Sequence, residues 1–394
     1  MTAEKNMKTI SRRAYLKKMA LAAAATGLPP AFRPLPAFAV EAPPQPKPTE
    51  SEAAAIAGIA RQLMSKYHAP GLSVAIARHG SFVYQQGFGD ANKTTGERVT
   101  PSSLFRIASL SKPITSVAIF SLIEQDRLRL DDLVFGARGL FKFDYGESYP
   151  ELVNKITLRH LLTHTCGGWE NNETDPMFSH QEMNHQELIA WTLGHQPLKY
   201  EPGAHYAYSN FGYCVLGRVI EKITAEPYAE FARKTVLAKC GVKDMRLAGN
   251  TYAERASGEV AYYGQPGAGT DPYNMNLTRT DSHGGWIATP SDLVQFLMHV
   301  DGFKTTPNIL GANTIKTMTT ASAANPNYAC GWCVNKVPNW WHNGSLPGTM
   351  TIMVRAASGL CWAAFANTRA NDFNLDDMMW NMVKAVPAWL KDEG

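Results

Sequence analysis

Charged residues are scarce in this chain of 394 residues, at 18% against a usual share of about 25%. Of its 38 Lys/Arg and 34 Asp/Glu, residues 1–39 hold seven and one, which leaves 31 basic and 33 acidic residues in the rest. A nucleic-acid-binding protein needs a basic patch that neutralises phosphates. We therefore expect no nucleic-acid partner. The 45% of hydrophobic residues predicts a folded globular protein.

Three widespread motifs are also missing. The chain has no Gly-x-Ser-x-Gly, which marks the nucleophile of α/β-hydrolases, and neither Gly-x-x-x-x-Gly-Lys nor Gly-x-Gly-x-x-Gly, which bind phosphates. These absences argue against an α/β-hydrolase and against a nucleotide enzyme. His160 and His164 have metal-ligand spacing on an expected helix, but no Glu follows His160. We expect hydrogen-bonding roles for both histidines, no metal site and no cofactor.

The N-terminal segment has the features of an export signal. Residues 11–17 (SRRAYLK) place an arginine pair before the apolar stretch 19–28, which is too short to span about 30 Å of hydrocarbon. It resembles a twin-arginine signal, and Ala37-Phe38-Ala39 predicts cleavage after Ala39. We expect export by the twin-arginine (Tat) machinery to the periplasm or medium. No cysteine lies near the cleavage site, so we expect no stable membrane anchor; the alternative is an unprocessed basic tail.

Six cysteines follow the predicted cleavage site, in a compartment where disulfides persist. Their spacing does not determine their pairing. Cys330 and Cys333 form a Cys-x-x-Cys motif, which is typical of redox proteins, but they lie in an apolar run that predicts a strand. A strand would put the two thiols on opposite faces. We therefore expect packing roles or one structural disulfide.

The pattern along the chain predicts strands near both ends and helices between them. Residues 40–49 predict a Pro-rich linker. Strand-like runs occupy residues 71–77, 82–88, 349–354 and 360–366, and helical spacing occupies residues 50–67, 157–163, 186–193, 211–223, 228–237, 290–300 and 375–390. We expect a discontinuous α/β domain, 50–133 with 284–394, and an inserted, mainly helical domain, 134–283.

Ser109 and Lys112 form a Ser-x-x-Lys motif at the start of an expected helix. Three residues make about one helical turn, so both side chains lie on the same face. A serine hydroxyl becomes a good nucleophile when a neighbouring base takes its proton. This motif predicts a nucleophile and its base.

A second motif, Tyr208-Ser209-Asn210, lies in a turn-rich approach to another expected helix. Free Tyr and Lys titrate near pH 10, so Tyr208 or Lys112 must lose about three pKa units to act as a base near neutral pH. Desolvation would give a neutral lysine and a nearby ammonium would give a tyrosinate. The sequence does not decide which of the two is the base.

The third motif is His342-Asn343-Gly344-Ser345, which leads into an expected strand. Gly344 would allow the backbone to approach a substrate closely. The backbone N–H groups of Ser345 and Ser109 are candidates for an oxyanion hole.

Together, and in this order, the three motifs resemble those of serine hydrolases related to class C β-lactamases and D-alanyl-D-alanine carboxypeptidases. The resemblance runs from about residue 50 to about residue 370 and includes SLFRIASLSKPIT, ITLRHLLTHTCGG, EPGAHYAYSNFGYCVLGRVIE, GGWIATPSDLVQF and HNGSLPGT. It implies an α/β (α+β), β-lactamase/transpeptidase-like fold. In that fold an antiparallel sheet flanked by helices meets a helical domain, and the active site lies in the cleft between them.

The resemblance also implies an acyl-enzyme mechanism. Ser109 would be the nucleophile, and Lys112 and Tyr208 would transfer protons. Asn210 would bind the substrate or Lys112. His342 and Gly344 would lie on the strand edge that binds substrate.

One departure concerns substrate choice. The β-lactamases carry Lys-Thr-Gly where this chain has His342-Asn343-Gly344. A histidine near its free pKa of about 6.5 is mostly neutral at pH 7, so a substrate carboxylate loses a permanent partner. We therefore expect an exported hydrolase of esters or small amides. The alternatives are a D-alanyl-D-alanine carboxypeptidase or weak β-lactamase, which would act on D-amino-acid peptides or β-lactams, and a catalytically silent homologue that binds cell-wall peptide.

Overall fold

The computed structural model describes residues 44–264 and 271–391. The predicted export signal, its cleavage site after Ala39 and residues 40–43 of the predicted linker lie outside these residues. The linker ends where Thr49 caps the first described helix, α2 (Glu50–Tyr67). The Thr49 side chain accepts a hydrogen bond from the Glu52 backbone, and the Glu52 carboxylate accepts one from Thr49. This reciprocal pair explains why the helix begins at Glu50.

Within the described residues, seven strands form one sheet in the order β3-β2-β1-β10-β9-β8-β7. Every pair in it is antiparallel. Pairing of β1 with β10 joins the two ends of the chain, with Ala75 opposite Ala363. The strands are β1 (Gly71–Arg78), β2 (Ser81–Asn92), β3 (Glu97–Arg98), β7 (Cys333–Val334), β8 (Trp340–Leu346), β9 (Thr349–Arg355) and β10 (Leu360–Ala366).

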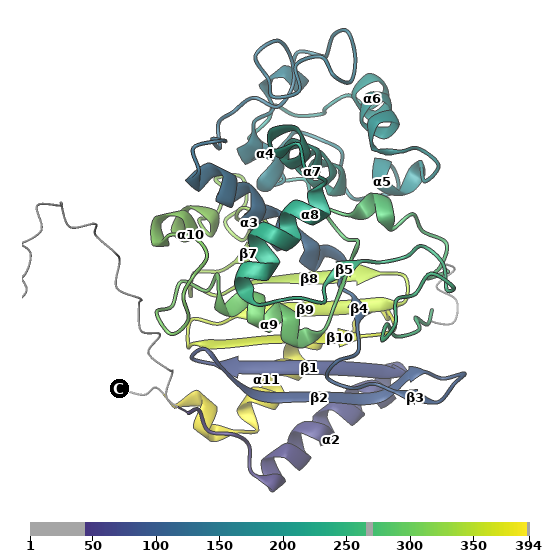
Figure 1. Cartoon of the computed structure of the whole chain (residues 1–394), viewed down its shortest axis with the longest axis vertical. Helices are drawn as coiled ribbons and strands as arrows, with labels where there is room; N and C mark the ends of the chain where they lie inside the picture. The colour runs from purple at the N-terminus through teal and green to yellow at the C-terminus, as the bar shows by residue number, and fades with distance from the viewer. Residues whose placement is uncertain (1–43, 265–270, 392–394) are drawn as a thin grey trace, which may run out of the picture. The chain divides into compact units, whose positions relative to one another are not determined.

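Helices cover both faces of this sheet (Figure 1). Side chains alternate between the faces along β10. Trp362 and Ala364 share one core with α2 and α11 (Leu375–Lys384), while Ala363 and Phe365 share the other with α9 (Pro290–Met298). Both faces of β10 are therefore buried, which explains its continuous apolar sequence.

The middle of the chain is mainly helical and lies over the β8 side of the sheet, at the top of Figure 1. Helix α3 (Ser111–Glu124) is buried from Ser111 to Leu122, because other helices pack around it. A second, small sheet has three strands in the order β4-β6-β5, which are β4 (Phe105–Arg106), β6 (Trp286–Ala288) and β5 (Arg246–Leu247). The other helices are α4 (Leu158–Leu162), α5 (Pro176–Ser179), α6 (His185–His195), α7 (Asn210–Thr224), α8 (Tyr228–Ala232), which continues as a π-helical turn over Arg233–Leu237, and α10 (Ala312–Met318).

Most predicted elements are present, and two differ from expectation. The segment 375–390 does not form one helix: α11 ends at Lys384, and a separate 3-10 turn covers Pro387–Leu390. Proline disfavours a helical conformation in the residue before it, which explains the break. The apolar run before Asn335 forms a strand only at Cys333–Val334, because Gly331 has a φ of +80° and turns the chain. The division into two domains stays a prediction.

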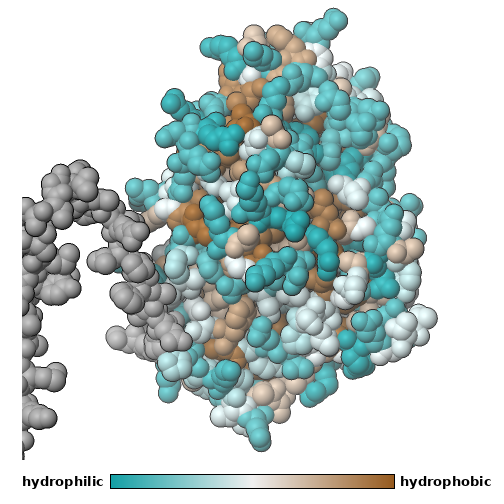
Figure 2. Space-filling model, in the orientation of Figure 1, coloured by the Kyte–Doolittle hydropathy of each residue, from teal (hydrophilic) through white to brown (hydrophobic). Residues whose placement is uncertain are grey.

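Hydrophilic residues cover most of the face drawn in Figure 2, and hydrophobic residues gather in separate patches. In residues 44–264 and 271–391, none of the helices combines the length and apolar character that a membrane crossing requires.

Candidate active site

Ser109 lies in a 3-10 turn, Ala108–Leu110, directly before α3. The preceding residue, Ala108, has a φ of +51°. A left-handed conformation is strained for alanine, and the buried surroundings of Ala108 hold it. The turn places Ser109 so that its Oγ lies 3.1 Å from Nζ of Lys112. The structure thus brings together the two residues of the Ser-x-x-Lys motif.

Lys112 is fully buried. Its Nζ lies 3.1 Å from Ser109 Oγ, 2.8 Å from Asn210 Oδ1 and 3.1 Å from the carbonyl oxygen of His283. Loss of water lowers the pKa of Lys112 to about 7, although the charge of Asp175 acts in the opposite direction. Near neutral pH a large fraction of Lys112 is therefore an uncharged amine with a lone pair.

Tyr208 completes this group. Nζ of Lys112 lies 4.7 Å from the centre of its ring. Desolvation raises the pKa of Tyr208 far above its ordinary value, and the Tyr208 hydroxyl is near enough to Ser109 for that side chain to lower this pKa slightly. The sequence left open whether Lys112 or Tyr208 is the base. These pKa shifts favour Lys112, because it can be neutral near pH 7 while Tyr208 keeps its proton.

Asn210 is the first residue of α7, which Ser209 caps through a hydrogen bond from Gly212 N to its Oγ at 3.0 Å. The Asn210 amide nitrogen donates to Asp175 Oδ2 at 2.8 Å and to Asn171 Oδ1 at 3.0 Å. Neither Asn171 nor Asp175 was predicted. The signal at Asp175 indicates only the start of a helix, because an Asp before Pro176 is a common N-cap.

His342 lies on β8 with only 3% of its surface exposed. Its Nδ1 lies 2.7 Å from the carbonyl oxygen of Asn343 and its Nε2 lies 3.1 Å from the hydroxyl of Tyr328. Burial lowers the pKa of His342 to about 3, so the ring is neutral. His342, which we expected to bind substrate, therefore uses both ring nitrogens for hydrogen bonds within the protein.

The two histidines with metal-ligand spacing are engaged as well. Nδ1 of His160 accepts from the backbone of Thr157, and Nδ1 of His164 accepts from that of Ser209. Nε2 of His164 lies 3.0 Å from the hydroxyl of Tyr328. Among the described residues, no group of three or more His, Cys, Asp or Glu side chains is placed to hold a metal ion.

Gly344 brings β8 against the turn that carries the nucleophile. A Cβ at this position would overlap the carbonyl oxygen of Ile107 and Oγ1 of Thr351. The sequence predicted that Gly344 lets the backbone approach a substrate closely. In the structure, it is the protein's own Ile107 and Thr351 that lie this close to Gly344. Strand β7 pairs only with Trp340 and Trp341, so beyond them that edge of β8 has no neighbouring strand among the described residues.

Ser345 is exposed on this free edge and lines a pocket of about 500 Å³. Asn171 lines the same pocket, together with the apolar side chains of Phe178, Met275 and Leu346. A pocket of this size fits a small organic group. The pocket therefore lies next to the Ser109–Lys112 pair, because Asn171 contacts Asn210, which in turn contacts Lys112.

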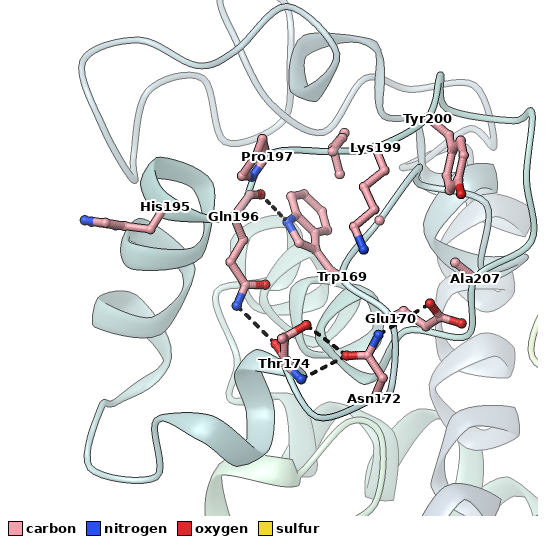
Figure 3. Close-up of a pocket in the computed structure, with 12 residues that line it drawn as sticks. Trp169, Glu170, Asn172, Thr174, His195, Gln196, Pro197, Lys199, Tyr200 and Ala207 are labelled. Carbon is pink, nitrogen blue, oxygen red and sulfur yellow. Dashed lines mark hydrogen bonds between the residues drawn. The ribbon is translucent and has the colours of Figure 1, made fainter.

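A second pocket, of about 330 Å³, lies against the loop that carries Asn171 (Figure 3). In this loop Asn172 Oδ1 accepts from the backbone and the hydroxyl of Thr174, at 2.9 and 2.8 Å. Trp169 donates through Nε1 to the carbonyl oxygen of Gln196 at 2.9 Å. These bonds fix the loop that brings Asn171 to Asn210.

Comparison with known proteins identifies the family of this chain. The model of a family described as Beta-lactamase matches residues 56–385. Penicillin-binding protein 4* of Bacillus subtilis (strain 168) is 28% identical over 324 residues, which cover 72% of this chain and 64% of that protein. The chain thus spans less than two thirds of the length of this relative.

Solved structures share the fold. The D-amino acid amidase of Ochrobactrum anthropi SV3, solved with L-phenylalanine amide, has a TM-score of 0.71 and 23% identity over 87% of this chain and 100% of that one. EstCE1, described as a hydrolase with promiscuous acyltransferase activity, has a TM-score of 0.68 and 19% identity over 86% of this chain and 98% of that one. Since the family model covers most of the described residues, the chain belongs to the beta-lactamase family of serine hydrolases.

Proposed function

We propose that this protein hydrolyses esters or small amides through an acyl-enzyme formed on Ser109. The observation that carries this proposal is the 3.1 Å distance between Ser109 Oγ and the buried Nζ of Lys112. Because burial lowers the pKa of Lys112 to about 7, this amine can accept the serine proton without a metal or an organic cofactor.

The proton transfers follow from the two shifted pKa values. Neutral Lys112 takes the hydroxyl proton as Ser109 attacks the carbonyl carbon, and the backbone N–H groups of Ser109 and Ser345 bind the developing oxyanion. Tyr208, which keeps its proton, gives it to the leaving alcohol or amine as the C–O or C–N bond breaks. The resulting tyrosinate takes a proton from the Lys112 ammonium. Water then attacks the acyl-enzyme, with the same groups moving its proton.

The environment of His342 supports the choice of substrate class. A neutral, buried histidine supplies no permanent positive charge for the carboxylate of a β-lactam. The amidase among the similar structures supports amide substrates, and the hydrolase with promiscuous acyltransferase activity supports transfer of an acyl group. The alternative is a D-alanyl-D-alanine carboxypeptidase or a weak β-lactamase, and the similarity to a penicillin-binding protein favours it.

Labelling with a fluorophosphonate tests the proposal. Mass spectrometry should place the adduct on Ser109, and Ser109→Ala should abolish labelling while Ser257→Ala, at an exposed serine, should not change it. Labelling that survives Ser109→Ala contradicts the proposal, and a chain that is never labelled is a catalytically silent homologue. Short-chain nitrophenyl esters, nitrocefin and a D-Ala-D-Ala peptide then separate the substrate classes, since faster turnover of the last two would favour the alternative.

Export is a separate part of the proposal. The arginine pair Arg12-Arg13 and the site after Ala39 support transport by the Tat machinery to the periplasm or medium. The mass of the mature protein should correspond to a first residue of Val40. A mature chain that begins at Met1 would contradict this.

A further inference from the structure

A buried carboxylate that the reaction above does not use lies behind the catalytic lysine. Asp175 has 1% of its surface exposed, and it caps the four-residue helix α5 by accepting from Met177 N at 2.9 Å. Its second oxygen, Oδ2, accepts from Asn210 Nδ2 at 2.8 Å. Burying a carboxylate is costly unless its oxygens are paired. A short helix cap needs only one of these oxygens, so the bond to Asn210 needs another explanation.

The two ends of the Asn210 side chain face groups of opposite kind. Nδ2 faces Asp175, and Oδ1 lies 2.8 Å from Nζ of Lys112. A carboxylate only accepts hydrogen bonds, whereas the amide of Asn171 can turn over and present either end. Asp175 is therefore the group that makes Nδ2 of Asn210 point away from Lys112 and Oδ1 point toward it.

We propose that Asp175 is a positioning residue for acylation, which acts through Asn210 to hold Lys112 beside Ser109 and acts by its charge to set the pH range in which Lys112 serves as base. This inference rests on the proposed function, because it assigns a partner to the proposed base. If the amide of Asn210 turned over, two donors would face each other and Lys112 would lose one of its three partners. The amine would then no longer be held in line with the serine hydroxyl.

The electrostatic part has a defined direction. The negative charge of Asp175 raises the pKa of Lys112, against the larger effect of burial. Burial also raises the pKa of Asp175, to about 6. The other titratable or charged groups that face this pair from the surrounding elements are His164, His283, His342, Arg279, Tyr208 and Tyr213. Burial raises the pKa of both tyrosines, so they keep their protons. Burial lowers the pKa of all three histidines, so the rings stay neutral over the relevant range.

The test is the rate of Ser109 labelling by a fluorophosphonate between about pH 5 and 9. The wild-type rate should rise with pH around the Lys112 pKa of about 7. Asp175→Asn removes the charge, so the midpoint of this rise should move down by roughly one pH unit, and the plateau rate should fall roughly 10- to 100-fold. Asp175→Ser, which keeps a good helix cap but no charge, should move the midpoint in the same direction and protects the test against a folding defect in the first variant.

A matched control comes from another buried aspartate. Asp301 also has 1% exposure and a pKa raised to about 6, and it accepts from Phe303 N. Asp301→Asn should leave the midpoint and the plateau as in the wild type. Asp175→Asn combined with Asn210→Ala should be no slower than Asn210→Ala alone, because one residue acts through the other.

The possible failures are distinguishable. A wild-type protein that is not labelled at Ser109 overturns the proposed function. Labelling at Ser109 with an unchanged midpoint in both Asp175 variants overturns only the inference, since loss of rate alone would be a structural effect. Additive losses in the double variant overturn it as well.

Discussion

The hydroxyl of Tyr328 lies 3.1 Å from Nε2 of His342 and 3.0 Å from Nε2 of His164. The hydrogen bonds that the two Nδ1 atoms make determine which partner donates in each contact with Tyr328. Nδ1 of His342 faces the Asn343 carbonyl and must donate, while Nδ1 of His164 faces the N–H of Ser209 and must accept. His164 therefore donates to Tyr328, which donates to His342. This chain of hydrogen bonds joins the start of α7 to β8, both of which border the nucleophile.

Tyr328→Phe should destabilise the protein, because it keeps the ring and removes the hydroxyl that serves both histidines. Each buried polar atom left without a partner costs about 1–3 kcal/mol. We expect the free energy of unfolding, measured in urea, to fall by about 2 kcal/mol or more. Tyr200→Phe, at a tyrosine with 44% exposure, should change it little. Equal stabilities of the two variants would contradict the hydrogen-bond chain.

The sequence predicted the side chains around Ser109 better than the residues that hold them in place. Ser109 and Lys112 are one helical turn apart, so local geometry alone brings them together. Placing Tyr208 beside them required the family resemblance, because 96 residues separate it from Lys112. Asp175 was missed because its sequence signal is that of an ordinary helix cap. The engagement of both His342 nitrogens depends on Tyr328, a contact that no pattern in the sequence indicates.

Lys112→Met should change the pH dependence of stability. An unfolded lysine binds a proton up to about pH 10.4, whereas burial lowers the folded pKa of Lys112 to about 7. Between these values the unfolded state binds more protons, so stability gained from this residue rises with pH. The stability of the variant relative to wild type should therefore increase as the pH falls from about 10 to 7, by a few kcal/mol, and then level off.

Thermal or urea unfolding at several pH values measures this difference, and labelling of the same variant should be lost. Lys316→Met, at an exposed lysine of α10, serves as the control and should show a nearly constant difference. A Lys112→Met difference that is independent of pH would mean that the lysine is charged in the folded protein near neutral pH.

Gly344→Ala should slow the labelling of Ser109 more than it lowers the stability of the protein. The added methyl group would meet the Ile107 carbonyl, which belongs to the segment leading into the Ser109 turn. Overpacking of this kind costs typically about 1–3 kcal/mol and shifts the backbone. We expect the labelling rate to fall roughly 100-fold, as measured by the rate of adduct formation.

Gly194→Ala is the matched control for that change. Gly194 lies in α6, and a Cβ there meets no atom within 4 Å. Alanine is better than glycine inside a helix by about 0.5–1 kcal/mol, so this variant should be slightly more stable and should be labelled at the wild-type rate. If Gly344→Ala behaved in the same way, β8 would not position the nucleophile.

Thiol chemistry distinguishes a packed Cys330-x-x-Cys333 segment from a redox pair. All six cysteines are free thiols, and burial raises the pKa of both Cys330 and Cys333 to about 12. Since the thiolate is the reactive form, a thiol reagent should modify the native protein very slowly and should modify all six cysteines once the protein is unfolded without reductant. Mild reduction should leave both the labelling rate and the melting temperature unchanged. A count of four thiols in the unfolded, unreduced protein, as a disulfide would give, would mean that the chain oxidises in its compartment and that β7 must move to allow it.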